Sequence, residues 1–519
     1  MRSFSFCIAV VLLGIASPMS AAPPVVTTLF PAGAARGSTT EVALGGTFTK
    51  WPVQVWCNSP QVKCTPGKAK NTIQVVVDAG ATPGLVYLRF HDAEGVSGLK
   101  PFQIGTIPDI AEKEPNDAPK TAQVVALPRV VNGRLEKNGD VDCFAVSLKK
   151  GETLVAHVDA EWSFQSPMDS VLQVVSTDGF ILEQNHDARR LDPQLAFTAP
   201  RDGNYIVRIF AFPSNPDSSI RFAGGDAYIY RLTLTTGPFI EAATKLALPP
   251  SDKPVPVELK GINLPGNVAE RTISVSVPKD AETVELYHPK WAGSFSARVE
   301  ASKNLVFGTL TQPGAIGSHK FEFKKAQPIL VQVESRALGF PLVPRLRVLG
   351  PDGKVIIETE VKDVSKDCEL TFTPKVDGTH TIEVHEQTAQ GGSRFHYRLR
   401  AEPVVPSFEI TVASDRFTVS MAKPLEIPVK VLRKRGFKQE IELNIDGLPD
   451  GATSEVITAK GKADPNTLLL RISATKPASG VPLQIRGQAK GIASPSVPVR
   501  GTSAELGTST TFLWLSVTK

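Results

Sequence analysis

Apolar and polar residues alternate along most of this 519-residue chain. The run from Leu425 to Arg433 alternates, and the apolar-rich segments Asn204 to Phe210 and Ala227 to Leu234 are typical of strands. A period of two directs one face of a strand toward a core and the other toward water. Glycine and proline turns separate the runs, and the 42 prolines make up about 8% of the chain against the usual ~5%. The pattern predicts an all-β protein without long helices.

The chain is too long for a single core, because domains usually hold about 100 to 150 residues. Proline- and glycine-rich junctions divide the alternating runs into tandem β-sandwich modules. The segment Gly105 to Ala111 is expected to be a linker, and Pro249 to Pro256 is expected to precede a strand. We predict five modules, at residues 23–107, 108–237, 238–304, 305–403 and 404–519.

Two of these modules share an internal repeat. The segment Arg345 to Gly353 matches Val171 to Gly179, and Leu370 to His380 matches Leu195 to Tyr205, at offsets of 174 and 175 residues. A repeat at a constant offset indicates two copies of one structural unit. We therefore predict that residues 305–403 repeat the fold of residues 108–237.

The first copy opens with two oxygen-rich segments that the second copy lacks. Glu-Lys-Glu-Pro-Asn-Asp spans 112–117, and Gly-Asp-Val-Asp-Cys-Phe spans 139–144. In an extended chain, alternate side chains of the first segment point to one side, and the second segment adds carboxylates. Ca²⁺ takes six to eight oxygen ligands from flexible loops. The alternative is that these residues only cap turns through backbone hydrogen bonds. The candidate calcium ligands are Glu112, Glu114, Asn116, Asp117, Asp140 and Asp142.

The motifs of residues 112–236 resemble the bacterial pre-peptidase C-terminal domain. They are the Glu-Pro-Asn-Asp opening, Gly-Asp-Val-Asp-x-Phe, the turn Thr177 to Gly179 and the strand Ala199 to Tyr205. The resemblance implies a jelly-roll-like sandwich that is commonly appended to secreted peptidases and has no catalytic machinery. It also implies calcium at the acidic edge, as in the similar collagen-binding modules. Residues 305–403 look like a second copy, in which the missing acids put calcium in doubt.

The remaining modules are expected to be immunoglobulin-like. The opening of residues 23–107 resembles the modules called IPT or TIG, with a Pro-x-x-Gly turn before the strand Thr40 to Phe48. Residues 238–304 and 404–519 show similarly spaced short strands.

The N-terminal residues indicate export. Arg2 precedes an apolar stretch, and small residues at 17–22 are typical of a cleavage site, so we expect a signal peptide over 1–21. No later stretch is apolar enough to predict a membrane span, and the expected location is secreted or periplasmic. In that compartment Cys57 and Cys64 either form a disulfide or remain buried thiols. The formal charge of +5 comes from scattered lysines and arginines, which does not favour nucleic acid binding.

No catalytic motif is present in the sequence. It has no G-x-S-x-G elbow, and His385-Glu386 does not continue as H-E-x-x-H. We expect a secreted, non-catalytic, calcium-binding protein that binds or scaffolds an extracellular polymer (protein or polysaccharide) or an envelope protein. The alternative is an accessory protein that directs a secreted peptidase or glycosidase to a polymer. Aromatic residues at 161–164 and 287–291 either contact such a polymer or pack inside the sandwiches.

Overall fold

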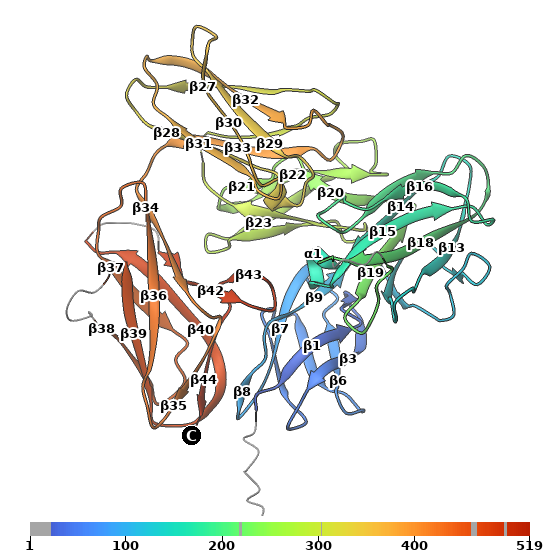
Figure 1. The fold of residues 1–519 in the computed structure, drawn as a ribbon, viewed down its shortest axis with the longest axis horizontal. Coiled ribbons are helices and arrows are strands. Elements are labelled where there is room, and N and C mark those ends of the chain that lie inside the picture. Colours follow the sequence, from blue (N-terminus) through green and yellow to red (C-terminus); the bar gives the residue numbers. More distant parts are fainter. Residues whose placement is uncertain are drawn as a thin grey trace, which may run out of the picture.

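The computed structural model describes residues 22–216, 221–302, 304–457, 464, 466–491 and 496–518, so the expected signal peptide lies outside the described residues. Strands make up 56% of the chain and helices 1%, which confirms the predicted fold class. Within the described ranges, the strands form ten sheets that pack as five sandwich modules (Figure 1). No helix in this part of the chain is long and apolar enough to cross a membrane.

The first module packs two antiparallel-rich sheets around one core. Its strands are β1 (Val25–Phe30), β2 (Gly33–Ala35), β3 (Thr39–Thr47), β4 (Gln54–Cys57), β5 (Val62–Pro66), β6 (Thr72–Val77), β7 (Gly84–Asp92), β8 (Gly95–Val96) and β9 (Lys100–Gly105). The sheet orders are β1-β3-β6-β5 and β2-β9-β7-β4. Alternation sets the core, as in β6, where Ile73, Val75 and Val77 are buried. Cys57 and Cys64 pack against this core as free thiols, so the disulfide alternative is not formed.

The second module is a sandwich of two five-stranded sheets. Its elements are β10 (Asp109–Ala111), β11 (Gln123–Val124), β12 (Arg129–Arg134), β13 (Asp142–Leu148), β14 (Thr153–Asp159), α1 (Glu161–Phe164), β15 (Met168–Val175), β16 (Ile181–Asn185), β17 (Gln194–Thr198), β18 (Gly203–Pro213) and β19 (Ile229–Thr235). The sheet orders are β10-β12-β19-β14-β17 and β11-β13-β18-β15-β16. The predicted linker was wrong at its end, because 109–111 pair with β12 as an edge strand.

The third module is the smallest and has two three-stranded sheets. Its strands are β20 (Phe239–Ala243), β21 (Ala247–Leu248), β22 (Ser251–Ile262), β23 (Thr272–Val277), β24 (Thr283–Leu286) and β25 (Phe295–Val299). Pro254 and Pro256 lie inside β22 and do not precede it, which corrects the prediction. The pairing of β22 with β23 shifts register between Ser251 and Val255, and such an irregularity tolerates Pro254, which cannot donate a ladder hydrogen bond. Pro256 lies beyond the shift and is paired with Ser274.

The fourth module has the strand order of the second without its first two strands. Its elements are β26 (Leu305–Thr309), β27 (Gly317–Phe323), β28 (Ile329–Glu334), η1 (Arg336–Leu338), β29 (Pro344–Leu349), β30 (Val355–Glu360), β31 (Cys368–Phe372), β32 (Gly378–Glu386) and β33 (His396–Pro403). The sheet orders β26-β33-β28-β31 and β27-β32-β29-β30 follow those of the second module strand for strand. The two segments related by the sequence repeat therefore have one topology.

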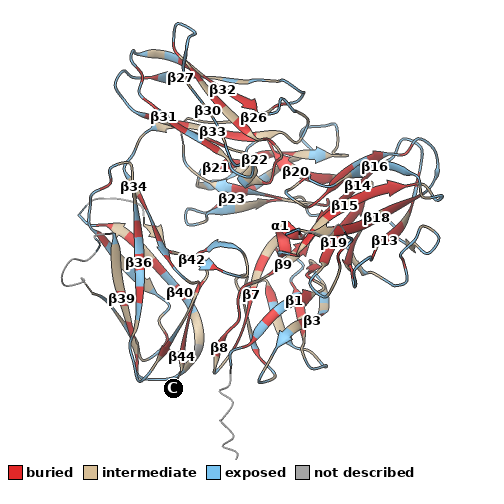
Figure 2. Cartoon of the chain, viewed as in Figure 1, coloured by how far each residue is buried: buried red, intermediate tan, exposed pale blue. Residues whose placement is uncertain are grey.

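The fifth module has a six-stranded sheet packed on a five-stranded sheet. Its strands are β34 (Ser407–Val412), β35 (Arg416–Ser420), β36 (Leu425–Lys434), β37 (Ile441–Asp446), β38 (Ala452–Ile457), β39 (Thr467–Ala474), β40 (Ala478–Ala489), β41 (Val497–Pro498), β42 (Arg500–Ser503), β43 (Thr508–Thr510) and β44 (Leu513–Thr518). The sheet orders are β38-β39-β36-β34-β42-β43 and β35-β44-β40-β37, with β41 beside β40. Figure 2 shows buried positions along the strands of each module, and in β19 every position is buried.

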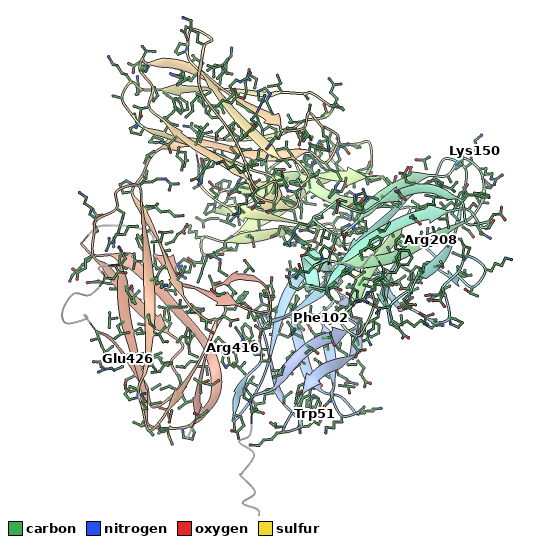
Figure 3. The ribbon with its side chains drawn as sticks, viewed as in Figure 1. Trp51, Phe102, Lys150, Arg208, Arg416 and Glu426 are labelled. Atoms are coloured by element: carbon green, nitrogen blue, oxygen red, sulfur yellow. The ribbon has the colours of Figure 1, made fainter. Side chains whose placement is uncertain are left out.

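Polar contacts join the modules to one another. Arg231 of the second module forms an ion pair with Asp109 at 2.8 Å and donates to Gln103 of the first at 2.9 Å. The last module lies beside the first, and Figure 3 shows Arg416 on the facing side. There, Arg89 forms an ion pair with Asp415 at 2.8 Å. The five modules thus have defined contacts beyond their covalent links.

Candidate metal centre

The six candidate ligands come together at one end of the second module. Glu112 follows β10, and the segment up to Asp117 bends at Glu114, so it is not the extended strand that the sequence predicted. Asp142 begins β13, and Asp140 lies in the turn before it. The backbone N–H of Cys143 donates to the Asn116 carbonyl at 3.0 Å, which holds the first segment against the second.

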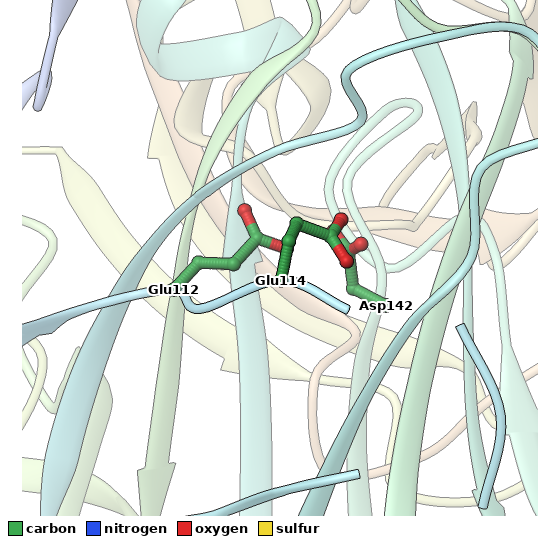
Figure 4. A group of neighbouring side chains, drawn as sticks. All are labelled: Glu112, Glu114 and Asp142. Carbon is green, nitrogen blue, oxygen red and sulfur yellow. The ribbon is translucent and has the colours of Figure 1, made fainter. Parts of the chain in front are cut away.

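Carboxylate oxygens from these segments converge in two overlapping groups. Glu112, Glu114 and Asp142 form one group, and Glu114, Asp117 and Asp140 form the other; within each group the oxygens lie within 4.8 Å of one another. Figure 4 shows the first group, with its three side chains gathered between the two segments. Glu114 belongs to both groups, so the donors form a continuous cluster.

Some of these oxygens cap backbone groups, as the alternative interpretation expects. Glu114 Oε2 accepts a hydrogen bond from the Asn116 N–H at 2.8 Å, and Asp140 Oδ2 accepts one from the Glu136 N–H at 2.5 Å. Glu112 Oε2 accepts one from the Arg134 N–H at 2.7 Å. Each cap uses one oxygen of its carboxylate. Capping therefore accounts for one oxygen on each of these three acids and leaves the other donor oxygens of the cluster unexplained.

Three other oxygens are buried and have no partner. They are Asn116 Oδ1, Asp140 Oδ1 and Asp142 Oδ1, on residues that are at most 1% exposed. Buried polar atoms almost always have a hydrogen-bond partner, so an orphaned oxygen calls for an explanation such as a bound ion. Three orphans in one cluster of acids are what a cation site requires.

The acids of this cluster form no ion pair with a basic side chain in the described part of the chain. Among the described residues, no Lys, Arg or His nitrogen lies within 4.0 Å of a carboxylate oxygen of the five acids. Burial and the charge of Glu112 raise the pKa of Asp142 to about 10. Burial also raises the pKa values of Glu112, Glu114 and Asp140. Close carboxylates can ionise together only when a cation compensates them.

The fourth module offers an internal comparison for these acids. An offset of 175 residues relates Gly203 to Gly378, and the pairing of β13 with β18 matches that of β27 with β32. Gly317 then occupies the place of Asp142, and Ala315 that of Asp140. A Cβ on Gly317 would lie 1.8 Å from the Tyr397 hydroxyl, so no carboxylate fits there. The sandwich therefore forms without the acids.

A different aspartate has the same contacts in both modules. Asp192 accepts hydrogen bonds from the backbone N–H groups of 160–162 at 2.7 to 3.1 Å, at the start of α1. Asp367 accepts from those of 335–337 at 2.8 to 2.9 Å, at the start of η1. This acid caps a helix in both modules. The acids at 112–142 have no such counterpart, which separates them from the structural acids.

Sequence reasoning missed one residue of the site. The Tyr230 hydroxyl is buried and donates a hydrogen bond to Asp142 Oδ2 at 2.6 Å. Its counterpart in the repeat, Tyr397, shares a hydrogen bond with His319 Nε2 at 2.7 Å instead. The sequence has Tyr-Arg-Leu at both 230–232 and 397–399, which was a signal for the position of this tyrosine, but its hydroxyl contact depends on the fold.

The aromatic residues expected either to contact a polymer or to pack inside are mostly packed. Phe164 and Trp291 are buried, and Trp291 stacks on His288 with ring centres 4.0 Å apart. Trp162 is half-buried, and the Arg189 guanidinium lies 4.7 Å from its ring centre. Packing therefore describes these rings better than an exposed polymer-binding face.

No protein-family model matches the chain, and no curated protein does. Among solved structures, the chain is similar to the pre-peptidase C-terminal domain of collagenase from Bacillus anthracis, with 12% identity and a TM-score of 0.18, over 24% of this chain and all of that one.

Two larger structures are also similar. The M60 catalytic domain with the CBM51 domains of ZmpB from Clostridium perfringens has 11% identity and a TM-score of 0.17, over 73% of this chain and 46% of that one. The surface layer protein SbsC, domains 1–6, has 13% identity and a TM-score of 0.14, over 93% of this chain and 54% of that one. This chain thus spans about half the length of the two larger structures. TM-scores this low carry no functional information.

Proposed function

We propose that the protein is an exported, non-catalytic binding or scaffolding protein whose second module holds a structural calcium ion. The observation that carries the calcium proposal is the set of three buried, partnerless oxygens within a cluster of five acids without ion pairs. Glu112, Glu114, Asp117, Asp140 and Asp142 supply carboxylates, and Asn116 supplies an amide oxygen. Six oxygen donors suit Ca²⁺, whereas Mg²⁺ keeps several waters and zinc favours nitrogen or sulfur.

The calcium ion would stabilise the approach of the first module to the second. Glu112 directly follows β10, which is the strand that ends the connection from the first module. Arg231 holds the same connection in place through its ion pair with Asp109. An ion that binds only the ordered segment stabilises it by mass action, by about 2.7 kcal/mol at a hundredfold excess over Kd.

The scaffolding part of the proposal rests on the contacts between modules. The first and last modules meet through the buried Arg89–Asp415 ion pair, and the second and fourth contact the third. Fixed relative positions suit a protein that holds surfaces at set distances. The sequence contains no motif of a nucleophile or a metalloprotease, so we assign no catalytic role. The expected partner is an extracellular polymer or an envelope protein.

The test of the calcium site is calorimetric titration of the full-length protein with Ca²⁺, together with thermal unfolding. We expect one ion to bind with a Kd between about 10⁻⁶ and 10⁻³ M and to raise the unfolding temperature. Glu114→Ala and Asp140→Ala should abolish both effects. Asp226→Ala is the control, because Asp226 is an exposed acid of the same module and lies outside the cluster.

Two results would refute the calcium site. The first is that the wild-type protein shows neither heat nor a shift in unfolding temperature. The second is that the Asp226 variant loses binding as much as the Asp140 variant does. Either result would leave the acids as turn caps.

A further inference from the structure

A cavity of about 520 Å³ lies where the first four modules meet. Its wall is formed by elements of all four modules. They are β7 and β9 of the first module, β14 and the helix α1 of the second, β20 and β25 of the third, and the segment 337–340 of the fourth. Figure 1 shows α1, β9 and β20 near this junction. The volume falls within the range of about 300–1,000 Å³ that is typical of small-molecule sites. The cavity shares no residue with the candidate metal centre.

The wall of the cavity is rich in arginine. Two of its arginines have an acid beside them: Arg231 pairs with Asp109 at 2.8 Å, and Arg298 lies 3.5 Å from Glu334. The other two arginines of the wall are Arg189 of the second module and Arg394 of the fourth. The arginines are Arg189, Arg231, Arg298 and Arg394. The acids of the wall are Asp159, Glu241 and Glu285.

Arg189 is a cation without a paired acid. It lies in the loop between β16 and β17, its guanidinium covers the ring of Trp162, and it packs on Gly339, where an added Cβ would lie 2.6 Å from Nε. Within the described ranges, its side chain makes no hydrogen bond, and no carboxylate oxygen lies within 4.0 Å of its nitrogens. Burial lowers the pKa of this guanidinium, although the charges of Asp159, Asp192 and Glu285 oppose the shift.

Arg394 is only partly neutralised. Its Nε lies 3.2 Å from Glu241 Oε1, but the geometry does not make a hydrogen bond, and Gln194 donates to the same oxygen. Burial lowers the pKa of Arg394, and the charge of Arg189 lowers it further, so the two guanidinium groups repel each other across the cavity wall.

We propose that this cavity binds a small molecule through an oxyanion group, a carboxylate, sulfate or phosphate, held by Arg189 and Arg394. Guanidinium groups bind oxyanions with paired, charge-assisted hydrogen bonds. Both guanidinium groups are half-buried, and an anion between them relieves their partial desolvation and their mutual repulsion. The remaining volume, lined by polar groups such as His157 and Gln103, accommodates a polar body. This inference goes beyond the proposed function.

The experiment is calorimetric titration of the full-length protein with glucuronate, inorganic phosphate and sulfate, and with glucose as the neutral probe. We expect at least one anion to bind and glucose not to bind. Arg189→Met and Arg394→Met should each weaken binding by at least about tenfold, because each removes charged hydrogen bonds. The ranking of the three anions identifies which oxyanion the cavity takes.

Arg190→Met is the matched control. Arg190 is adjacent in sequence, pairs with Glu161 at 2.7 Å and is half exposed, so its loss should leave the affinity unchanged. If Arg189→Met does not fold, Arg189→Lys keeps the charge without the paired donors and should still weaken binding. The proposal is overturned if none of the anions binds the wild-type protein, if glucose binds equally well, or if folded Arg189 variants keep the wild-type affinity.

Discussion

The buried ion pair between Arg89 and Asp415 joins the first and last modules, and its removal should release them. The two side chains are 0% and 2% exposed, and their N···O distance is 2.8 Å. The Arg89 guanidinium also donates to the carbonyls of Ser97 at 2.9 Å and Phe512 at 2.8 Å. Asp415 therefore supplies the acid for a cation that water cannot reach while the modules are in contact.

The expected effect follows from what remains after the substitution. Asp415→Ala leaves a buried cation unpaired, which costs about 3–5 kcal/mol. The aromatic contacts of Trp56 with Phe512 and Trp514, and of Tyr87 with Phe512, persist. Three such pairs contribute about 1.5–4.5 kcal/mol. Because the loss is as large as the contribution of these three pairs, the two modules should be apart in a larger fraction of molecules than in the wild type.

Small-angle X-ray scattering and amide hydrogen exchange measure this opening. We expect a larger radius of gyration for Asp415→Ala and faster exchange in β8 and β44, which lie at the contact. Arg471→Met is the control in the same module, since Arg471 and Glu426 form an exposed pair worth at most about 1 kcal/mol.

The double variant Arg89→Met, Asp415→Leu distinguishes a general packing defect from an unpaired charge. Replacing a buried ion pair by apolar groups is often neutral, so this variant should scatter like the wild type. The reasoning is refuted if Asp415→Ala keeps wild-type scattering and exchange, or if the double variant opens as far as the single one.

Three further predictions concern single residues. Asp192→Ala and Asp367→Ala should each lower stability by at least about 2 kcal/mol in thermal unfolding, because three backbone N–H groups lose their acceptor; an unchanged melting temperature would contradict this. Burial and nearby cations lower the pKa of His396 from 6.5 to about 4. Between about pH 6.5 and pH 4 the folded protein therefore binds fewer protons than the unfolded chain. The free energy of unfolding should fall as the pH drops through this range, and His396→Gln should reduce that pH dependence. Gly133→Ala places a Cβ 2.1 Å from Tyr230 Cζ. The substitution should lower stability in urea unfolding by about 1–3 kcal/mol and weaken calcium binding. An unchanged calcium affinity would show that Tyr230 does not contribute to the site.

The alternation of apolar and polar residues was sufficient to predict that strands exist, but it did not predict where each strand begins and ends. Alternation over 425–433 predicted β36, because a two-residue period is a property of neighbouring residues. It failed for 109–111 and for the prolines of β22, where pairing with a distant strand decides whether a short or proline-containing segment is a strand. Strand pairing is a long-range event that no local window records.

For the candidate metal centre, the sequence by itself determined the residue types, their two segments and the absence of those acids from the repeat. Only the tertiary structure decided that Asn116, Asp140 and Asp142 each keep one buried oxygen without a partner, and that Tyr230 lies against them. The central cavity depended on tertiary structure entirely, because Arg189 and Arg394 belong to different modules and no spacing relates them. Alternation and composition are properties of residues that are close in sequence. The burial of particular atoms, oxygens without a partner and the approach of like charges arise only when segments distant in sequence pack together.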